Sequence, residues 1–389
     1  MSRQYNDPAG GTPSQIGTQF TTHHYDKRAL IEARKEQYFT QLADVTSMPK
    51  NMGKKIKKYH YIPLLDDANI NDQGLDASGA VIANGNLYGS SKDVGTISAK
   101  MPVLSETGGR VNRVGFKRKE LEGTFEKFGF FDEYTKDSLN FDSDAELEMH
   151  VRREMVNGAN EITEDALQID LLNSAGIVKF AGNATQNNEL GEDDLVTYGD
   201  LLRLSIDLDN SRTPKHTTII TGTRLVDTKT IPSCRVAYIG SELLPTFKAM
   251  KDLHNEPAFI SVEKYAAGTT LLNGEVGMVD QFRLVVVPEM MKWAGAGADA
   301  SSSATSYETA DKYDVFPILV VGNESFTTIG FQTDGKSVKF DITHKKPGKE
   351  TADRNDPYGE TGFMSIKWFY GFMLLRPERI ALIKTVARM

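Results

Sequence analysis

The stretch that decides the fold is residues 356–387, DPYGETGFMSIKWFYGFMLLRPERIALIKTVA. Read with a period of two, its middle predicts a strand about twice the usual length with one fully apolar face. That face carries Met364, Ile366, Trp368, Tyr370, Phe372 and Leu374. Pro357 and Gly359 predict a turn before the strand, and Arg376-Pro377 predicts its end.

A second apolar run, Ile380 to Val386, follows and closes the chain. We interpret the two runs as a strand pair that serves as scaffold. The alternative interpretation is an ordinary buried hairpin of a globular domain. The apolar face of the first run is expected to pack on a helix, which leaves Lys367 on the opposite face for a contact outside that core.

The composition is that of a folded protein with more than one core. The chain has 389 residues, 39% of them hydrophobic and 25% charged, which is enough for two or three domain-sized cores. It contains no run of about 18 apolar residues and no apolar signal-peptide core near its N-terminus, so we expect no membrane partner. The one cysteine, Cys234, is expected to be buried and inert.

Charge is distributed unevenly although the net charge is only −8. Residues 1–62 hold ten Lys/Arg against five Asp/Glu, and residues 92–119 hold seven against two. Residues 132–172 hold twelve acidic and three basic residues. These segments are either solvated faces or complementary patches that attract one subunit to the next. Nucleic acid is a third partner for the basic segments, but the net negative charge argues against tight DNA binding.

Two elements frame the middle of the chain. Residues 96–104 and 110–123, on either side of the turn Glu106-Thr107-Gly108-Gly109, predict a long polar hairpin that needs a partner surface. Residues 143–173 predict a long helix, with a capping box at Ser143 and Glu146 and a stop near Gly176. Its predicted apolar stripe is Val151, Met155, Ala159, Ile162, Ala166 and Ile169.

The rest of the chain predicts a compact mixed α/β block over residues 197–290, in which residues 223–230 are expected to be helical. The Ala/Ser-rich residues 294–311 predict an exposed loop, and residues 315–331 and 337–348 predict further strands.

Motifs that carry chemistry are weak. Phosphate-binding loops, zinc-ligand spacings and the serine-hydrolase elbow do not occur, and Glu164-Asp165 is interpreted as an exposed acid pair on the helix. Residues 67–78 begin like a calcium loop but carry Asp72 where glycine is needed and Ser78 where glutamate is needed. We expect no catalytic residue, cofactor or metal site. An enzyme built on residues 196–314 is one hypothesis for the function of the chain.

The order of parts resembles the major capsid protein of tailed bacteriophages, a fold shared with encapsulin shells. Residues 274–290 (GEVGMVDQFRLVVVPEM) and 315–331 (VFPILVVGNESFTTIGF) look like segments that leave and re-enter the domains of these proteins. Residues 356–387 look like the closing strands of schitovirus-type short-tailed phages. The matched positions there are Asp356, Pro357, Gly359, Gly362, Lys367, Leu375, Arg379 and Ile380.

The resemblance implies an α+β tailed-phage capsid fold and a division of the chain. Residues 1–61 would be an N-terminal arm and 62–130 an extended loop. Residues 131–195 and 315–389 would form a peripheral domain around the spine helix 143–173, and 196–314 an axial domain. The function implied is self-assembly into the icosahedral head around double-stranded DNA, within the host cytoplasm and then in the virion. The alternative is an encapsulin-like cellular shell.

The implied partners are further copies of the chain, as hexamers and pentamers, with portal, scaffolding or decoration proteins and non-specifically bound DNA. Charge complementarity suggests which residues meet across subunits. The basic set is Lys100, Arg110, Arg113, Lys117, Arg118 and Lys119, and the acidic set is Glu146, Glu154, Glu161 and Asp165.

Overall fold

The computed structural model describes most of the chain beyond residue 117. The described residues are 2–5, 14–18, 37–42, 44–48, 53–62, 92–99, 116, 118–141, 147–220, 228–231, 234–265, 271–300, 306–331, 340–350, 352, 354 and 356–388. The chain divides into two compact units. Unit 1 comprises residues 1–53 and 125–389, and unit 2 comprises residues 54–124.

Strands supply most of the regular structure. The shorter or N-terminal ones are β1 (Ser2–Tyr5), β2 (Ser14–Thr18), β3 (Asp44–Met48), β4 (Lys55–Tyr61), β6 (Ile177–Phe180), β7 (Thr217–Ile220), β8 (Thr228–Ile231), β10 (Phe259–Ser261), β13 (Glu308–Thr309) and β14 (Lys312–Tyr313). The others are β5 (Arg118–Thr135), β9 (Arg235–Gly240), β11 (Glu275–Val279), β12 (Phe282–Val287), β15 (Phe316–Val321), β16 (Phe326–Phe331), β17 (Phe340–Lys345), β18 (Thr361–Leu374) and β19 (Ile380–Thr385).

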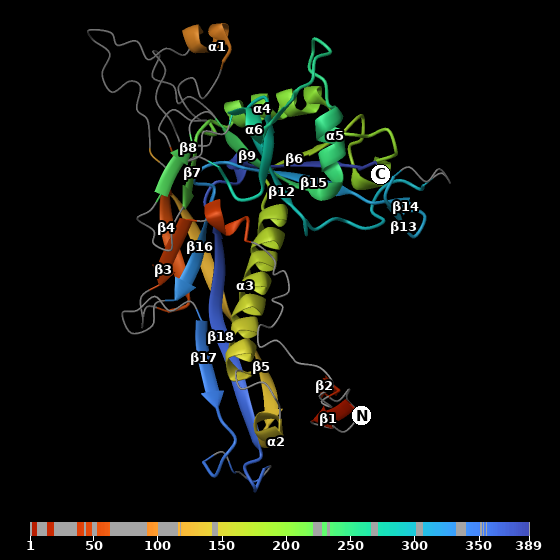
Figure 1. The fold of residues 1–389 in the computed structure, drawn as a ribbon. Helices are drawn as coiled ribbons and strands as arrows, with labels where there is room; N and C mark the ends of the chain where they lie inside the picture. Colours follow the sequence, from red (N-terminus) through yellow and green to blue (C-terminus); the bar gives the residue numbers. More distant parts are fainter. Residues whose placement is uncertain are drawn as a thin grey trace, which may run out of the picture. The chain divides into compact units, whose positions relative to one another are not determined.

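One helix is much longer than the other described helices (Figure 1). The α-helices are α1 (Val94–Ala99), α2 (Lys136–Phe141), α3 (Leu147–Asn173), α4 (Tyr198–Asn210), α5 (Leu244–Ala249) and α6 (Val262–Tyr265). Short 3-10 helices are η1 (Thr40–Leu42), η2 (Asn187–Glu189), η3 (Ser241–Leu243) and η4 (Pro377–Arg379).

A seven-stranded sheet, in the order β10-β11-β12-β9-β15-β19-β6, is covered on both faces. Leu201, Leu204 and Leu208 of α4 pack on one face together with Phe247 of α5. The C-terminal half of α3 packs on the other face. Every residue of β9 and β15 is consequently buried, as expected of strands covered on both sides.

The second large sheet has the order β3-β16-β18-β5-β4, and β17 also pairs with β18. The expected strand in the closing segment is confirmed as β18, and α3 runs along it in Figure 1. Met364, Ile366 and Trp368 are buried in the same cluster as Met155 and Ala159 of α3. Phe128, Phe130 and Phe340 surround Trp368, with ring centroids 5.8–6.0 Å away. The predicted packing of this face on the helix is therefore confirmed from Met364 to Tyr370, whereas Phe372 and Leu374 are only half-buried and Met373, expected on the opposite face, is buried.

The predicted pairing of the two closing runs is wrong. β18 pairs with β16 and β17, whereas β19 lies between β15 and β6 in the other sheet. The connection at residues 375–379 carries the chain from one sheet to the next, and Ser325 O accepts hydrogen bonds from Leu375 N and Arg376 N, both at 2.9 Å. Lys367 pairs within the subunit, with Asp341 of β17 at 2.8 Å.

The long helix ends where expected, but its buried face differs from the predicted stripe. Ile162 and Ile169 are 44% and 46% exposed, whereas Leu167 and Leu171 are fully buried. The stripe fails because the C-terminal half of α3 packs both on β18, where the Tyr370 hydroxyl donates to Asp170 at 2.8 Å, and on the seven-stranded sheet, so the buried face turns along the helix. Gly176 follows the helix closely against η4, and its N–H donates to Pro377 O at 3.1 Å. A Cβ at this position would lie 2.4 Å from Pro377 O.

Three other predictions of local structure are wrong where the structure describes them. Residues 96–99 are helical within α1, with Ile97 N donating to Asp93 O at 3.0 Å, because Asp93 is a favourable residue before a helix. Residues 228–230 lie in β8, where β-branched threonines pair with β7. Residues 296–300 pack by their alanines on Leu190 and Val315, and Gly297 N donates to Tyr313 O, so this part is not an exposed loop.

β6, β15 and β19 share one sheet with β9 and β12, so this sheet contains strands from both sides of residues 195 and 314. The predicted capping box at Ser143 and Glu146 and the turn at residues 106–109 lie outside the described residues.

Candidate assembly surfaces

The first candidate surface is the β4–β5 hairpin of unit 2. β4 pairs antiparallel with residues 118–124 of β5, from Lys55 opposite Thr124 to Tyr61 opposite Arg118. Directly opposite residues share a face, so one face carries Lys55, Lys57, Tyr59 and Tyr61 with Arg118, Glu120, Glu122 and Thr124. We call these eight residues the tyrosine face.

Charges on the tyrosine face are paired with one another. Lys55 pairs with Glu122, and Lys57 lies 3.4 Å from Glu120. The pKa of the Glu122 carboxyl is lowered because Lys55 donates a hydrogen bond to it and attracts its charge. Water screens such exposed pairs, so they align the strands more than they stabilise them.

Two aromatic side chains remain open on this face. Tyr59 and Tyr61 are 55% and 63% exposed, and the Arg118 guanidinium lies 4.0 Å from the centroid of the Tyr59 ring. Tyrosine and arginine are enriched at the centres of protein interfaces. The composition of the tyrosine face is therefore that of a contact surface.

The second candidate surface lies on the exposed side of α3. Glu154, Glu161 and Asp165 are spaced by seven and four residues, so they share one helix face. Ile162 and Ile169 lie at its margin and are nearly half exposed. Glu154 pairs with the neighbouring Arg153 at 3.1 Å. We call Glu154, Glu161, Ile162, Asp165 and Ile169 the acidic strip.

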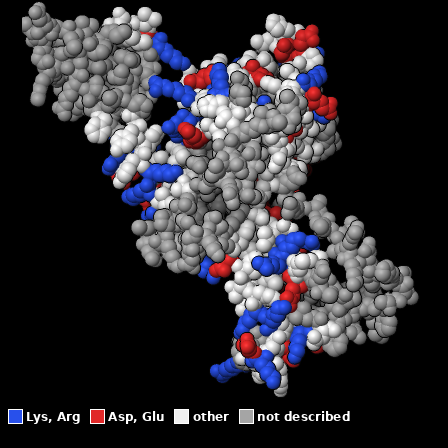
Figure 2. All heavy atoms as spheres, turned by 60° about the vertical axis from the view of Figure 1, so that its left-hand side comes forward, with Lys and Arg blue, Asp and Glu red and all other residues white. Residues whose placement is uncertain are grey.

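The structure places half of the predicted contact residues. Arg118 lies on the tyrosine face and Lys119 on the opposite face of the hairpin, while Glu154, Glu161 and Asp165 form the acidic strip. Lys100, Arg110, Arg113, Lys117 and Glu146 lie outside the described residues. On the face drawn in Figure 2, basic and acidic side chains of the described residues lie beside one another.

Sequence reasoning missed the tyrosines and misplaced one acid. A period-two reading of residues 55–61 would have found Tyr59 and Tyr61 on one face. Glu164 was expected to be exposed beside Asp165, but Glu164 is only 8% exposed. The reason is that residues 37–42 cover this side of α3, which no local pattern in the helix reveals.

Groups that could carry chemistry are sparse among the described residues. No cluster of three or more His, Cys, Asp or Glu in this part of the chain could hold a metal ion. Cys234 is buried, and burial raises the pKa of its thiol, which keeps it in the unreactive form. The incomplete calcium loop at residues 67–78 lies outside the described residues. Within the described residues, no helix has the length and hydropathy required to cross a bilayer.

Comparison with solved structures defines the class of protein. The chain matches the capsid of Ralstonia phage GP4 with a TM-score of 0.61, 97% of this chain and 99% of that chain being covered at 10% identity. It matches the cyanophage Pam1 capsid with a TM-score of 0.56, covering 96% and 98% at 10% identity. The capsid of Helicobacter pylori phage KHP30 gives 0.55 over 100% of both chains at 12% identity. The fold is therefore the α+β capsid fold of tailed phages.

Sequence comparison then gives the family. The chain is 66% identical over 387 residues to the major capsid protein of Pseudomonas phage KPP21, covering 99% of this chain and 98% of that protein. The chain belongs to the phage major capsid protein family. These matches confirm the expected capsid resemblance and do not favour the encapsulin alternative. No protein-family profile matches the chain.

Proposed function

We propose that this chain assembles with further copies of itself into hexamers and pentamers of an icosahedral head that encloses double-stranded DNA. Membership in the major capsid protein family supports a structural role rather than catalysis. In this proposal, DNA is held non-specifically, and portal, scaffolding or decoration proteins join the shell. In this proposal the N-terminal arm is residues 1–61 and the extended loop is 62–130. The peripheral domain is residues 131–195 and 315–389, and the axial domain is 196–314.

The observation that carries the self-assembly proposal is the β4–β5 hairpin. It belongs to a compact unit of its own, residues 54–124, and its tyrosine face exposes two aromatic rings. β4 is the edge strand of its sheet, so the tyrosine face borders a sheet edge that a surface of another chain can cover. In this proposal a neighbouring copy supplies that surface, and the unit comprises the end of the N-terminal arm and most of the extended loop.

We propose that the receiving surface is the acidic strip of the next copy. Its isoleucines would cover the tyrosine rings, and its carboxylates would face Arg118. Closed symmetry makes the same pair of surfaces meet at every copy around a ring. The pairing is heterologous, because the hairpin of one subunit meets the helix of another.

A deletion tests whether unit 2 drives assembly. Residues 56–123 are replaced by Asn-Gly, which removes both tyrosines and Arg118 and joins Lys55 directly to its cross-strand partner Thr124 by a two-residue turn. The expected product has a near-unchanged circular dichroism spectrum and sediments as a subunit or small oligomer. Normal shells from this variant in negative-stain images would overturn the proposal.

A charge exchange tests the pairing of the two surfaces. Arg118→Glu is expected to impair shell formation, and adding Asp165→Lys to the same chain is expected to restore it. Lys119→Glu is the matched control, because it makes the same charge change on the opposite face of β5 and should cost less assembly. Failure of the double variant to recover shells, with Arg118→Glu alone impaired, would contradict this pairing and leave self-assembly intact.

A further inference from the structure

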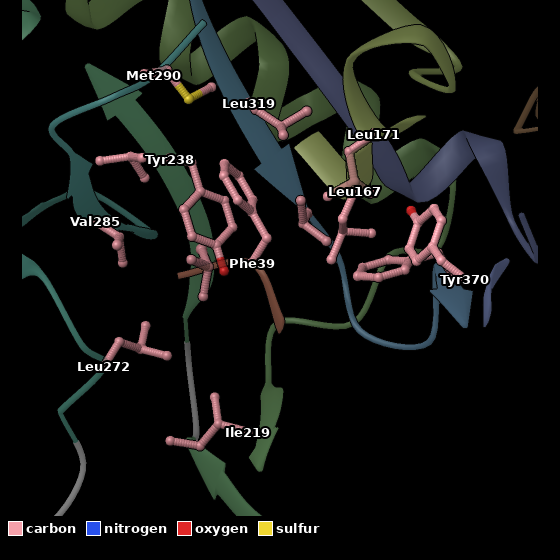
Figure 3. Packing of buried hydrophobic residues seen from close by; sticks show 14 of the residues in the cluster. Phe39, Leu167, Leu171, Ile219, Tyr238, Leu272, Val285, Met290, Leu319 and Tyr370 are labelled. Carbon is pink, nitrogen blue, oxygen red and sulfur yellow. The ribbon is translucent and has the colours of Figure 1, made fainter. Parts of the chain in front are cut away.

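Residues 37–42 pack into the core of unit 1, far in sequence from the elements that surround them. Phe39 is 1% exposed, and its ring centroid lies 4.5 Å from that of Tyr238 in β9. Figure 3 shows the two rings side by side, with Leu167 of α3 nearby. Tyr238 is itself fully buried, so the segment fills space at the centre of the core rather than lying on its surface.

Polar contacts fix the backbone of this segment. Glu164 of α3 accepts hydrogen bonds from Tyr38 N at 2.6 Å and from Phe39 N at 2.5 Å. The Tyr238 hydroxyl donates to Tyr38 O at 3.1 Å. Further along, Asn273 N donates to the Gln41 side chain at 3.2 Å. One carboxylate therefore satisfies two backbone donors that lead into η1, where a negative charge is favourable.

The residues that follow attach to the other sheet. β3 pairs parallel with β16, from Asp44 opposite Thr327 to Met48 opposite Phe331. The hydroxyls of Thr46 and Thr327 lie 2.9 Å apart. Residues 37–42 thus contact α3 and the seven-stranded sheet, while residues 44–48 belong to the sheet that contains β18.

Two short connections also join these sheets, and they lie against each other. Residues 322–325 link β15 to β16, and residues 375–379 link β18 to β19. Gly322 N donates to Arg379 O, and Arg379 Nη1 lies 2.8 Å from Asn323 O. Connections of this length allow two sheets to shift about them unless a further contact holds the sheets together.

We propose that residues 37–42 and 44–48 form a clasp that holds the two sheets of unit 1 in one arrangement, and that Glu164 is the positioning residue that closes it. When the clasp is closed, the segment is bound to both sheets and to the helix between them. When the contact at Glu164 is lost, Phe39 loses its backbone anchor, and the two sheets remain joined by the short connections and by α3, which packs on both.

The surroundings of Glu164 fit a dedicated contact rather than a general surface acid. Its Oε2 atom is buried and has no hydrogen-bond partner among the described residues. Burial raises the pKa of its carboxyl, opposed by hydrogen bonds from the backbone N–H groups of Phe39, Tyr38 and Thr40 and from the Thr40 hydroxyl. Burying an acid is unfavourable unless it is hydrogen-bonded, so its position is explained by the donors of residues 38–40.

Hydrogen exchange of the full-length protein, assembled or not, tests the clasp. Glu164→Ala is expected to speed exchange in peptides covering residues 37–42 at least tenfold, with a smaller increase at 44–48. Glu164→Gln keeps an acceptor oxygen for the two N–H groups, so its protection factors should stay within about threefold of the original. Glu256→Gln, at an exposed position in the 250–258 turn, is the control and should change neither segment.

Two results would overturn the proposal. The first is unchanged protection of residues 37–42 in Glu164→Ala. The second is an equal loss of protection in β9, which would mean that Glu164 supports the whole core rather than the clasp. Because exchange is measured within the subunit, these outcomes are independent of whether shells form.

Discussion

The strands β15 and β4 differ in how their two faces are covered. Each side chain of β15 is buried, because α4 and α5 cover one face of its sheet and α3 covers the other. β4 alternates between exposed and half-buried side chains, and its charges are paired across the hairpin. The comparison shows that one part of the chain carries its own core, whereas the other has the composition of a surface that needs a partner.

The largest expected effect tests the self-sufficient side of this comparison. Leu319 is fully buried in the middle of β15, so Leu319→Ala should lower the free energy of unfolding by about 2–5 kcal/mol. Urea denaturation of the unassembled subunit measures it. Ile206→Ala, at a residue 60% exposed on α4, should change it by less than about 0.5 kcal/mol. Equal losses in the two variants would remove the distinction between core and surface.

For the tyrosine face we expect the reverse pattern, a small effect on subunit stability and a large effect on assembly. Tyr59→Ser combined with Tyr61→Ser should change subunit stability by under about 1 kcal/mol, because both rings are exposed. The protein concentration needed for assembly should rise about tenfold or more, as for loss of aromatic anchors at an interface. Light scattering against concentration measures this. Tyr358→Ser is the control, since Tyr358 is exposed but lies outside the hairpin; the same rise there would contradict the assignment.

Glu164 adds a pH-dependent test of the buried core, because it is an acid inside that core. Its pKa is raised by burial, so the folded state binds its proton more tightly than the unfolded state does. The corresponding stability is fully present below about pH 4.5, the ordinary value, and is lost as pH rises through the native pKa. The titratable groups that interact with it are Tyr238 and Tyr370, and the pKa of Asp170, which is hydrogen-bonded to Tyr370, is raised in the same direction.

We therefore expect a difference in how steeply the unfolding free energy falls as the pH rises. Between pH 5 and 8, Glu164→Gln should show a shallower fall in unfolding free energy than the original chain, and Asp170 should account for part of the slope that remains. Parallel curves for the two proteins would show that Glu164 does not titrate as its burial implies.

The smallest expected effect concerns the ion pairs of the hairpin. Lys57→Gln and Glu120→Gln, singly and together, form a double-mutant cycle around a pair at 3.4 Å. The coupling energy should be at most about 1 kcal/mol and should fall in high salt, since both side chains are exposed. A coupling of several kcal/mol would mean that β4 is held as firmly as β15.

Local pattern predicted the elements better than their partners. The period-two run gave β18 and its apolar face because alternation fixes which side chains are buried together. It could not show that β19 leaves for another sheet, since both runs are equally apolar and pairing depends on distant strands. The helix stripe failed at Ile162 and Ile169 for a related reason, because the C-terminal half of α3 packs both on β18 and on the seven-stranded sheet.

The candidate surfaces were predicted in part. Charge counts led to Arg118 and to the acids of α3, because like charges gather on elements that are not in a core. The same counts overlooked the tyrosines, which carry no charge, and treated Glu164 as one more surface acid. Its burial depends on residues 37–42, which lie more than 120 positions away in the chain.

The position of β19 has a mechanical consequence. The last strand is paired with β15 over six residues on one side and with β6 over four on the other. A force pulling the C-terminus along the strand would load both rows of backbone hydrogen bonds in shear, so they would have to fail together instead of opening one at a time. A tether attached after this strand would therefore transmit tension into an inner strand of the sheet.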